Sequence, residues 1–439
     1  MGIEPRGYIV QLCTLINSYE EELVDKAKPF EISKPVVYEA WKKVKANKGS
    51  AGIDEVTIEA FEKNLGDNLY KIWNRMSSGS YFPKAVKTVE IPKKDGGQRA
   101  LGIPTVSDRV AQMVVVMYLE PEIEPHFHDD SYGYRPNKSA IEAVGVARQR
   151  CWRYDWVVDL DIRKYFDTIP HDLLWRAVNK HTQCKWILLY IGRWLTGEIQ
   201  QIDSSIVNRT RGVPQGGVIS PLLSNLFLHY AFDLWMKTSY STLPFERYAD
   251  DAIVHCKSLA QARMVKRAIE KRFIECGLQL HPHKTKIVYC KDDDRKGHHE
   301  NEQFDFLGFT FRARRSKNRW GKHFINFSPA VSKDAMTKMR QEMRKWKVHL
   351  RSDKSLEDLC RMFNPILSGW ITYYSSYYKS ALYPVLRHFN RTLTRWVTRK
   401  YKRFRRHRRR AQHWLGRIAH KQPNLFRHWQ MGVRPSVGQ

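Results

Sequence analysis

Residues 247–256 read Arg247-Tyr248-Ala249-Asp250-Asp251-Ala252-Ile253-Val254-His255-Cys256. An apolar run follows the two adjacent carboxylates, and with the preceding Phe245 to Ala249 it predicts a β-hairpin with Asp250 and Asp251 at or beside its tight turn. Adjacent carboxylates repel each other, and each raises the pKa of the other unless a cation lies between them. Mg²⁺ is commonly held by one or two carboxylates, with water and substrate phosphates as its other ligands. The pair is therefore typical of a phosphoryl-transfer site, although a solvated turn also explains it.

A second pair of acids interrupts the apolar stretch Trp156 to Asp161. Side chains alternate along a strand, so Asp159 and Asp161 point the same way, about 7 Å apart at about 3.3 Å per residue. Acids on an otherwise buried strand need a partner. Helix capping would explain Asp167, which follows in the sequence, but it would not explain these two acids.

Residues 86–104 predict another hairpin, with a turn at Lys94-Asp95-Gly96-Gly97. It would carry Lys93 and Arg99, and two cations on a rigid hairpin suit a triphosphate ligand. An edge hairpin protected by charge explains them as well.

A glycine-rich loop, Gly212-Val213-Pro214-Gln215-Gly216-Gly217, precedes a helix that begins at Ser220-Pro221. Its glycines allow the backbone to approach a ligand closely. The loop has no Walker lysine and does not follow the dinucleotide-binding pattern, so by itself it does not identify the ligand.

Charge is concentrated at the C-terminal end of the chain. The 439 residues carry a formal net charge of +30, and from Leu359 to Gln439 there are 18 Lys or Arg residues and no Asp or Glu. A polyanion is the expected partner; no apolar run approaches the length of a bilayer span. Seven scattered cysteines form no C-x-x-C pair, which indicates reduced cytosolic thiols and neither a disulfide framework nor a zinc site.

Three amphipathic helices are predicted after residue 330, because apolar residues recur there at helical spacing. The third runs into residues 399–410, where nine of twelve residues are cations. A solvated helix would interleave acids to relieve repulsion, and none occurs. Phosphate contacts with nucleic acid are therefore expected from Arg399, Lys400, Lys402, Arg403, Arg405, Arg406, Arg408, Arg409 and Arg410.

Several further motifs occur in a fixed order. They are Asn47-Lys48-Gly49, Ile91-Pro92-Lys93, Leu101-Gly102-Ile103-Pro104, Tyr132-Gly133-Tyr134-Arg135-Pro136, the Asp161 strand, Pro214-Gln215-Gly216-Gly217, Tyr248-Ala249-Asp250-Asp251, Phe306-Leu307-Gly308-Phe309, Asn364-Pro365 and Gly369-Trp370. From about residue 33 to 415 the chain resembles the group II intron-encoded reverse transcriptase/maturases. Only about 20 residues follow Leu415, so the C-terminal endonuclease that some relatives carry is not expected.

The resemblance implies an α+β right-hand polymerase, with fingers and an antiparallel palm sheet followed by an α-helical thumb or maturase domain. The expected parts are an N-terminal extension (1–32), fingers (33–155), a palm with fingers insertions (156–312), the thumb/maturase domain (313–415) and a short basic tail (416–439). A bacterial cytosolic location is expected from the family.

The resemblance also implies roles for individual residues. Asp161, Asp250 and Asp251 match the ligands of two Mg²⁺ ions, and Asp161 is preferred to Asp159 for its spacing to Phe166. Phe166 would exclude a ribose 2′-hydroxyl. The remaining matches are Lys93 and Arg99 for the triphosphate, Gln215 and Gly216 for the nucleotide pocket, and Lys284 near the leaving pyrophosphate.

The expected activity is RNA-directed DNA synthesis from dNTPs, with an RNA template, a DNA primer or target and intron RNA as partners. Two rivals stay open on the sequence: a non-catalytic RNA-binding splicing factor, against which the three aspartates argue, and a domesticated polymerase of DNA repair or phage defence.

Overall fold

The computed structural model describes residues 28–92 and 97–437. These residues form two compact units, each made of several chain segments. The first unit holds the described residues up to Lys138, together with Leu160–Ala252 and Arg263–Thr285. The second holds Ser139–Asp159, Ile253–Ala262 and the chain from Lys286 onward.

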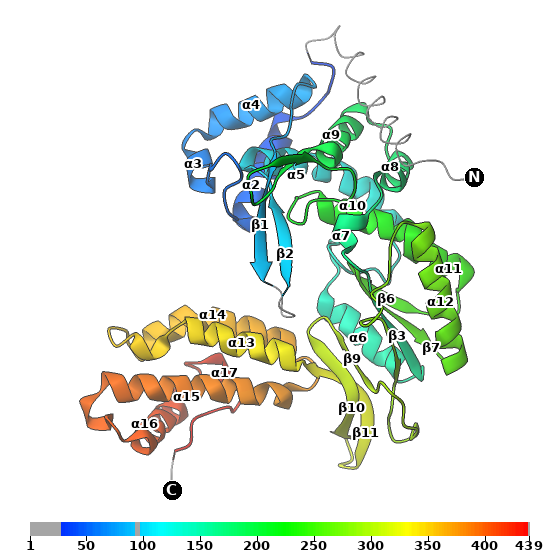
Figure 1. Ribbon diagram of the computed structural model, residues 1–439. Helices are drawn as coiled ribbons and strands as arrows, with labels where there is room; N and C mark the ends of the chain where they lie inside the picture. Colours follow the sequence, from blue (N-terminus) through cyan, green and yellow to red (C-terminus); the bar gives the residue numbers. More distant parts are fainter. Residues whose placement is uncertain (1–27, 93–96, 438–439) are drawn as a thin grey trace. The chain divides into compact units, whose positions relative to one another are not determined.

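Helices make up most of the first unit (Figure 1). They are α2 (Lys34–Asn47), α3 (Ile58–Lys63), α4 (Leu65–Ser77), α5 (Val106–Ile123), η1 (Glu124–His126), α7 (Tyr165–Thr168), α8 (His171–Asn179), α9 (Lys185–Thr196), α10 (Ser220–Leu228), the π-helical turn η2 (His229–Asp233), α11 (Leu234–Ser239) and most of α12 (Leu259–Glu275). Ser33 is the N-cap of α2, a proline follows in the first turn, and Val37, Trp41 and Val44 are buried.

The predicted hairpin at residues 86–104 is confirmed as β1 (Val86–Pro92) and β2 (Gln98–Ile103), which pair antiparallel with Ile91 opposite Arg99. Two short strands, β4 (Glu198–Gln200) and β5 (Ile206–Asn208), extend this sheet in the order β2-β1-β4-β5. The hairpin projects from the helices of the first unit (Figure 1).

The acidic motifs lie on a second sheet, of order β6-β7-β3-β8. Its strands are β3 (Trp156–Asp161), β6 (Phe245–Tyr248), β7 (Asp251–Cys256) and β8 (Lys286–Tyr289). The predicted hairpin of residues 245–256 is confirmed, with only Ala249 and Asp250 between its strands. Trp156, Val157, Val158 and Leu160 are buried, so β3 is the apolar strand interrupted by acids that the sequence predicts.

The second unit contains a three-stranded antiparallel sheet and a helical bundle (Figure 1). The sheet has the order β11-β10-β9, and α6 packs on β11. The elements are α6 (Ala140–Cys151), β9 (Gln303–Phe306), β10 (Phe309–Lys317), β11 (His323–Val331), α13 (Lys333–Lys345), η3 (Val348–Leu350), α14 (Leu356–Tyr374), η4 (Lys379–Leu382) and α15 (Tyr383–Lys400). The three predicted amphipathic helices are confirmed as α13, α14 and α15, whose apolar faces share one core.

The structure corrects two expectations about the basic C-terminal end. The third helix does not run through residues 399–410, because α15 ends at Lys400 and the chain turns through η5 (Lys402–Phe404), where Phe404 is buried, before α16 (Arg408–Lys421) begins. The predicted domain end at residue 415 falls inside α16. The chain beyond it is also not a simple tail, because Phe426 and Trp429, beside and within α17 (Arg427–Gln430), are fully buried in the helical core.

None of the helices in the described ranges is both long and apolar enough to cross a membrane. The six cysteines that the structure describes form no disulfide.

Candidate active site

The turn between β6 and β7 places Asp250 and Asp251 at a strand end. Ala249 holds a left-handed backbone conformation, with φ of +57°, which costs a non-glycine residue about 1–2 kcal/mol. Gly133 lies against this turn so closely that a Cβ on it would be 2.3 Å from the Ala249 nitrogen. The segment around Gly133 therefore fixes the turn, and no larger residue fits there.

Arg247 holds the turn from inside the protein. Its guanidinium is 1% exposed and makes a bidentate ion pair with the fully buried Asp233, at 2.7 and 2.5 Å. The same guanidinium donates hydrogen bonds of 3.0 Å to Asn225 Oδ1 and to the carbonyl oxygen of Ala249. A buried ion pair is thus joined directly to the backbone that carries Asp250.

Asp161 lies at the end of β3, where the backbone of a neighbouring loop holds it. The amide of His281 donates to the Asp161 carbonyl at 2.7 Å, and Thr285 hydrogen-bonds the Asp161 backbone through its hydroxyl. The half-exposed carboxylate of Asp161 lies 3.8 Å from the Nζ atom of Lys284. The structure therefore brings together two predicted site residues that are 123 positions apart.

Asp250 lies in an environment that disfavours its charge. Burial is the largest cause of the raised pKa of this carboxyl, and the nearby Asp161 raises it further, while Arg99 and Arg247 oppose the shift. The pKa of Tyr134 is likewise raised, by burial first and then by Asp250. Asp161 lies on β3 and acts electrostatically on Asp250, which favours Asp161 as a partner of Asp250.

Asp161 and Asp250 repel each other, and a divalent cation between two such carboxylates would stabilise them. The residues that would hold it are Asp161, Asp250 and Asp251. Among the described residues no group of three or more His, Cys, Asp or Glu side chains lies close enough to form a complete metal cluster. Asp161 thus ends β3 and Asp251 begins the neighbouring strand β7, but the described carboxylates do not form a complete metal-binding cluster.

The glycine-rich loop packs against the β2 strand and α7. The Gly102 amide donates to the Gln215 carbonyl at 2.9 Å, and the Val213 amide donates to the Phe166 carbonyl at 2.8 Å. Gly216 has φ of +126°, and a Cβ on it would be 2.5 Å from the Gly102 carbonyl oxygen. Glycine is required here for close backbone approach.

Gln215 links the loop to two other predicted elements. Its Oε1 accepts a 2.7 Å hydrogen bond from Nε of Arg99, and its Nε2 lies 3.3 Å from a carboxylate oxygen of Asp167. Gln215 and Gly216 also line a cavity of about 310 Å³. The structure thus joins the predicted residues Arg99, Gln215 and Gly216, while Lys93 lies outside the described residues.

Phe166 is buried in α7, with its ring 5.3 Å from that of Tyr165. A role in the hydrophobic core explains this burial without any contact with a sugar. The predicted function of Phe166 therefore needs its own test.

The cations of residues 399–410 have different surroundings. The ammonium of Lys400 donates to the Ser352 and Lys354 carbonyls, and the guanidinium of Arg403 lies 4.7 Å from the Phe404 ring centre, so both have contacts within the protein. Arg405, Arg406, Arg408, Arg409 and Arg410 are exposed, and no side-chain hydrogen bond or ion pair is found for them among the described residues. The same holds for Arg399 and Lys402, so these seven members of the run are available to a ligand.

Sequence reasoning missed the residues that support the turn. Arg247 could have indicated such a support, because a cation within a buried apolar strand needs a buried partner. Its partners Asp233 and Asn225 lie 14 and 22 positions away, with no pattern that links them to it.

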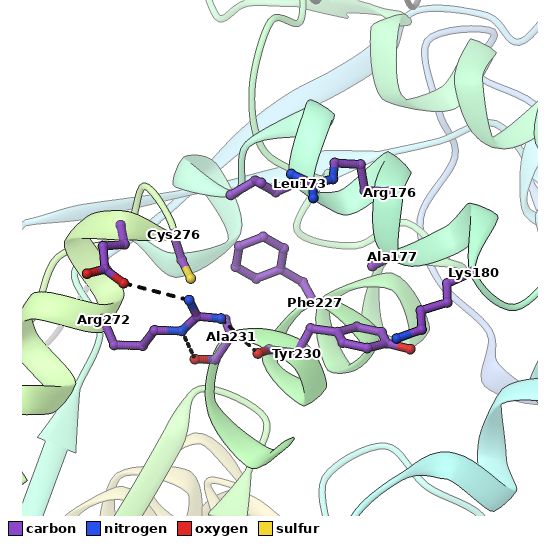
Figure 2. A pocket seen from close by; sticks show the side chains of 10 residues that line it. Leu173, Arg176, Ala177, Lys180, Phe227, Tyr230, Ala231, Arg272 and Cys276 are labelled. Carbon is purple, nitrogen blue, oxygen red and sulfur yellow. Dashed lines mark hydrogen bonds and ion pairs between the residues drawn. The ribbon is translucent and has the colours of Figure 1, made fainter. Parts of the chain in front are cut away.

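A cavity of about 460 Å³ lies between α8, α10, η2 and α12, and Figure 2 shows the side chains that line it. None of its lining residues is a predicted site residue. Arg272 donates to the carbonyls of Tyr230 and Ala231 in the π-helical turn, at 3.2 Å each, and pairs with Glu275. π-Helical turns are rare and often accompany functional sites; this one carries Asp233, so Arg272 supports the partner of Arg247.

Comparison with known families identifies two matching regions of the chain. Residues 91–311 match the family described as reverse transcriptase (RNA-dependent DNA polymerase), which is about half of the chain. Residues 336–414 match the group II intron, maturase-specific domain. The chain belongs to the reverse transcriptase family and is of the group II intron type. Members of this family generally use divalent metal ions and act on nucleic acids.

Individual relatives support the assignment. Protein YkfC of Escherichia coli (strain K12) is 32% identical over 312 residues, which are 62% of this chain and 77% of YkfC. Group II intron-encoded protein LtrA of Lactococcus lactis subsp. cremoris is 31% identical over 219 residues, 48% of this chain and 36% of LtrA. A putative COX1/OXI3 intron 2 protein of Saccharomyces cerevisiae is 30% identical over 191 residues, covering 43% and 22%. The matched region thus spans about a third or less of the two intron-encoded relatives.

Proposed function

We propose that this protein is an RNA-directed DNA polymerase that adds dNTPs to a primer 3′-hydroxyl and also binds intron RNA to promote its splicing and mobility. The observation that carries the proposal is the Asp250 turn, held by Arg247 beside Asp161 within the region matched to the reverse transcriptase family. The first unit would supply the fingers and palm of a right-hand polymerase. The helical bundle would be the thumb or maturase domain.

The reaction assigns a task to each group at the site. Asp161, Asp250 and Asp251 would hold two Mg²⁺ ions, which when bound lower the pKa of the primer hydroxyl and neutralise charge on the triphosphate. Arg99, positioned by Gln215, would pair with triphosphate oxygens. Lys284, within 3.8 Å of Asp161, would donate a proton toward the departing pyrophosphate.

Primer extension on an RNA template, with Mg²⁺ and either dNTPs or rNTPs, tests the proposal. Extension that requires dNTPs is expected. The rival in which the chain is a non-catalytic RNA-binding factor predicts RNA binding with no extension under any salt or primer condition.

Replacing Phe166 by valine tests its predicted role against the sugar. If the ring excludes a 2′-hydroxyl, the variant should use rNTPs about 10- to 100-fold better relative to dNTPs, the range expected when a steric barrier of this size is removed. Competition between dNTPs and rNTPs in primer extension measures the ratio. If the Phe166→Val variant were less stable but kept its selectivity for dNTPs over rNTPs, the buried Phe166 ring would serve only the hydrophobic core.

Neutralising Arg405, Arg406, Arg408, Arg409 and Arg410 together should weaken RNA binding and flatten its salt dependence. Each lost phosphate contact should reduce the slope of log K against log salt by about 0.7 to 0.9. Binding titrations at several salt concentrations give the slope directly. An unchanged slope would remove these arginines from the RNA interface.

A further inference from the structure

A cavity of about 510 Å³ in the second unit is lined by arginines from three segments. Arg387 and Arg391 come from α15, Arg408 and Arg409 from α16, and Arg434 from the C-terminal segment. No acidic residue lines this arginine pocket. Arg387, Arg391 and Arg434 lie outside the basic run that the sequence singles out, so the pocket is a new grouping.

Specific contacts fix the C-terminal wall of the arginine pocket. Asn390 of α15 donates to the Val433 carbonyl at 3.0 Å and accepts a 2.9 Å hydrogen bond from the Trp429 indole. Arg434 donates through Nε to the Trp429 carbonyl at 3.1 Å. The final segment also packs directly on α16, because a Cβ on Gly416 would be 2.4 Å from the Ser436 carbonyl oxygen. Arg434 is therefore held beside the helices by packing.

The other arginines of the pocket lack counter-charges. Arg387, Arg391, Arg408 and Arg409 are exposed, and within the described part of the chain no side-chain hydrogen bond or ion pair is found for any of them. The pKa of the neighbouring His388 is lowered, first by burial and then by Arg391 and other arginines of α13 and α15. The positive potential of the arginines therefore also acts on residues outside the pocket. Mutual repulsion of this kind is relieved by a bound polyanion.

The start of α16 adds to the positive potential. Its N-cap His407 makes no side-chain capping bond, and its first turn contains no acid. Arginines at positions 408 and 409 thus stand at the positive end of the helix dipole, where anions, not cations, are stabilised. The helix and the arginine side chains favour the same kind of ligand.

We propose that the arginine pocket binds the phosphodiester backbone of RNA at a sharp bend, where neighbouring phosphates converge. A regular duplex spreads its phosphates over a convex surface, whereas these arginines line one concave cavity. Each guanidinium can bind a phosphate through two parallel hydrogen bonds. The choice of RNA rests on the proposed function, since four of the five arginines lie in the region matched to the maturase-specific domain.

The test compares two charge-matched variants of the full chain. Arg387→Gln with Arg391→Gln removes two pocket cations that the sequence did not assign to RNA. Lys317→Gln with Lys322→Gln removes two exposed cations near the tip of the β10–β11 hairpin of the same unit. Binding is titrated at several salt concentrations with a bulged RNA hairpin, a fully paired RNA hairpin of equal length and a bulged DNA hairpin.

The pocket variant should lose about tenfold in affinity for the bulged RNA, and its salt slope should fall by about 1.4 to 1.8 for two lost contacts. The affinity of the pocket variant for the paired hairpin should change less. The control variant should lose the same affinity, relative to wild type, for the bulged and the paired RNA. Arg387→Lys with Arg391→Lys should keep the salt slope but not the full affinity, because lysine lacks the two-pronged geometry.

Equal losses in the pocket and control variants, or equal losses for bulged and paired RNA, would overturn the proposal. A bulged DNA hairpin that responds as the RNA does would overturn the assignment to RNA. Primer extension on a short unstructured template is measured on the same preparations. Wild-type protein without extension would contradict the polymerase proposal alone, because binding at the arginine pocket is read separately.

Discussion

Replacing both Asp250 and Asp251 by asparagine is expected to abolish primer extension, with a loss of about 10³-fold or more, since several kcal/mol of transition-state stabilisation would go with the two carboxylate charges. RNA affinity should stay within a few fold, because no cation is removed. Primer extension and RNA titration on one preparation measure both quantities.

The stability of this double variant separates a catalytic role from a structural one. Because the pKa of Asp250 is raised, the folded protein binds the proton of this carboxyl more tightly than the unfolded chain does. Ionisation of Asp250 therefore lowers the free energy of unfolding as the pH rises above the ordinary pKa of an aspartate. A neutral asparagine removes that cost at pH 7. The variant should therefore unfold at the same or a higher temperature than wild type, although it is inactive.

The exposed neighbours Asp293 and Asp294 provide a matched control. Their replacement by asparagine removes the same two charges from a loop of the second unit, and extension should persist. If both double variants lost activity alike, net charge and not the Asp250 turn would be responsible. Extension by the Asp250 and Asp251 variant near the wild-type rate would show that these two carboxylates do not carry the reaction.

The parts of this site that are local in sequence could be predicted, and the parts that are not local could not. The hairpin of residues 245–256 is encoded by its own alternation and tight turn, so Asp250 was placed correctly. Helical periodicity likewise gave α13, α14 and α15. The carbonyl contact between Arg247 and the turn depends on Asp233 and Asn225, which reach it only in the folded protein.

The basic C-terminal stretch shows how a sequence pattern can mislead about geometry. The apolar periodicity of the third helix predicts that this helix runs into residues 399–410. Burial of Phe404 instead turns the chain after Lys400. That turn starts a new helix at Arg408 and brings Arg408 and Arg409 beside Arg387 and Arg391 of α15, a grouping that no linear charge count contains.

Replacing Arg247 by methionine should destabilise the protein by about 3–5 kcal/mol, because Asp233 would be left buried without its counter-charge. Activity should also fall at temperatures where the variant is still folded, since the Ala249 carbonyl loses its donor. Thermal unfolding and primer extension measure the two effects. Arg247→Lys should recover little of either, because an ammonium group cannot reproduce the bidentate pair and the Ala249 contact together.

A second variant separates positioning from stability. Combining Arg247→Met with Asp233→Leu removes the whole ion pair, and apolar replacement of a buried pair is often close to neutral in stability. We expect the double variant to regain most of the lost stability while extension stays low, because the hydrogen bond to the Ala249 carbonyl is still absent. If activity returned together with stability, Arg247 would serve the fold alone. If only stability returned, Arg247 would be a positioning residue that acts through the backbone of the Asp250 turn.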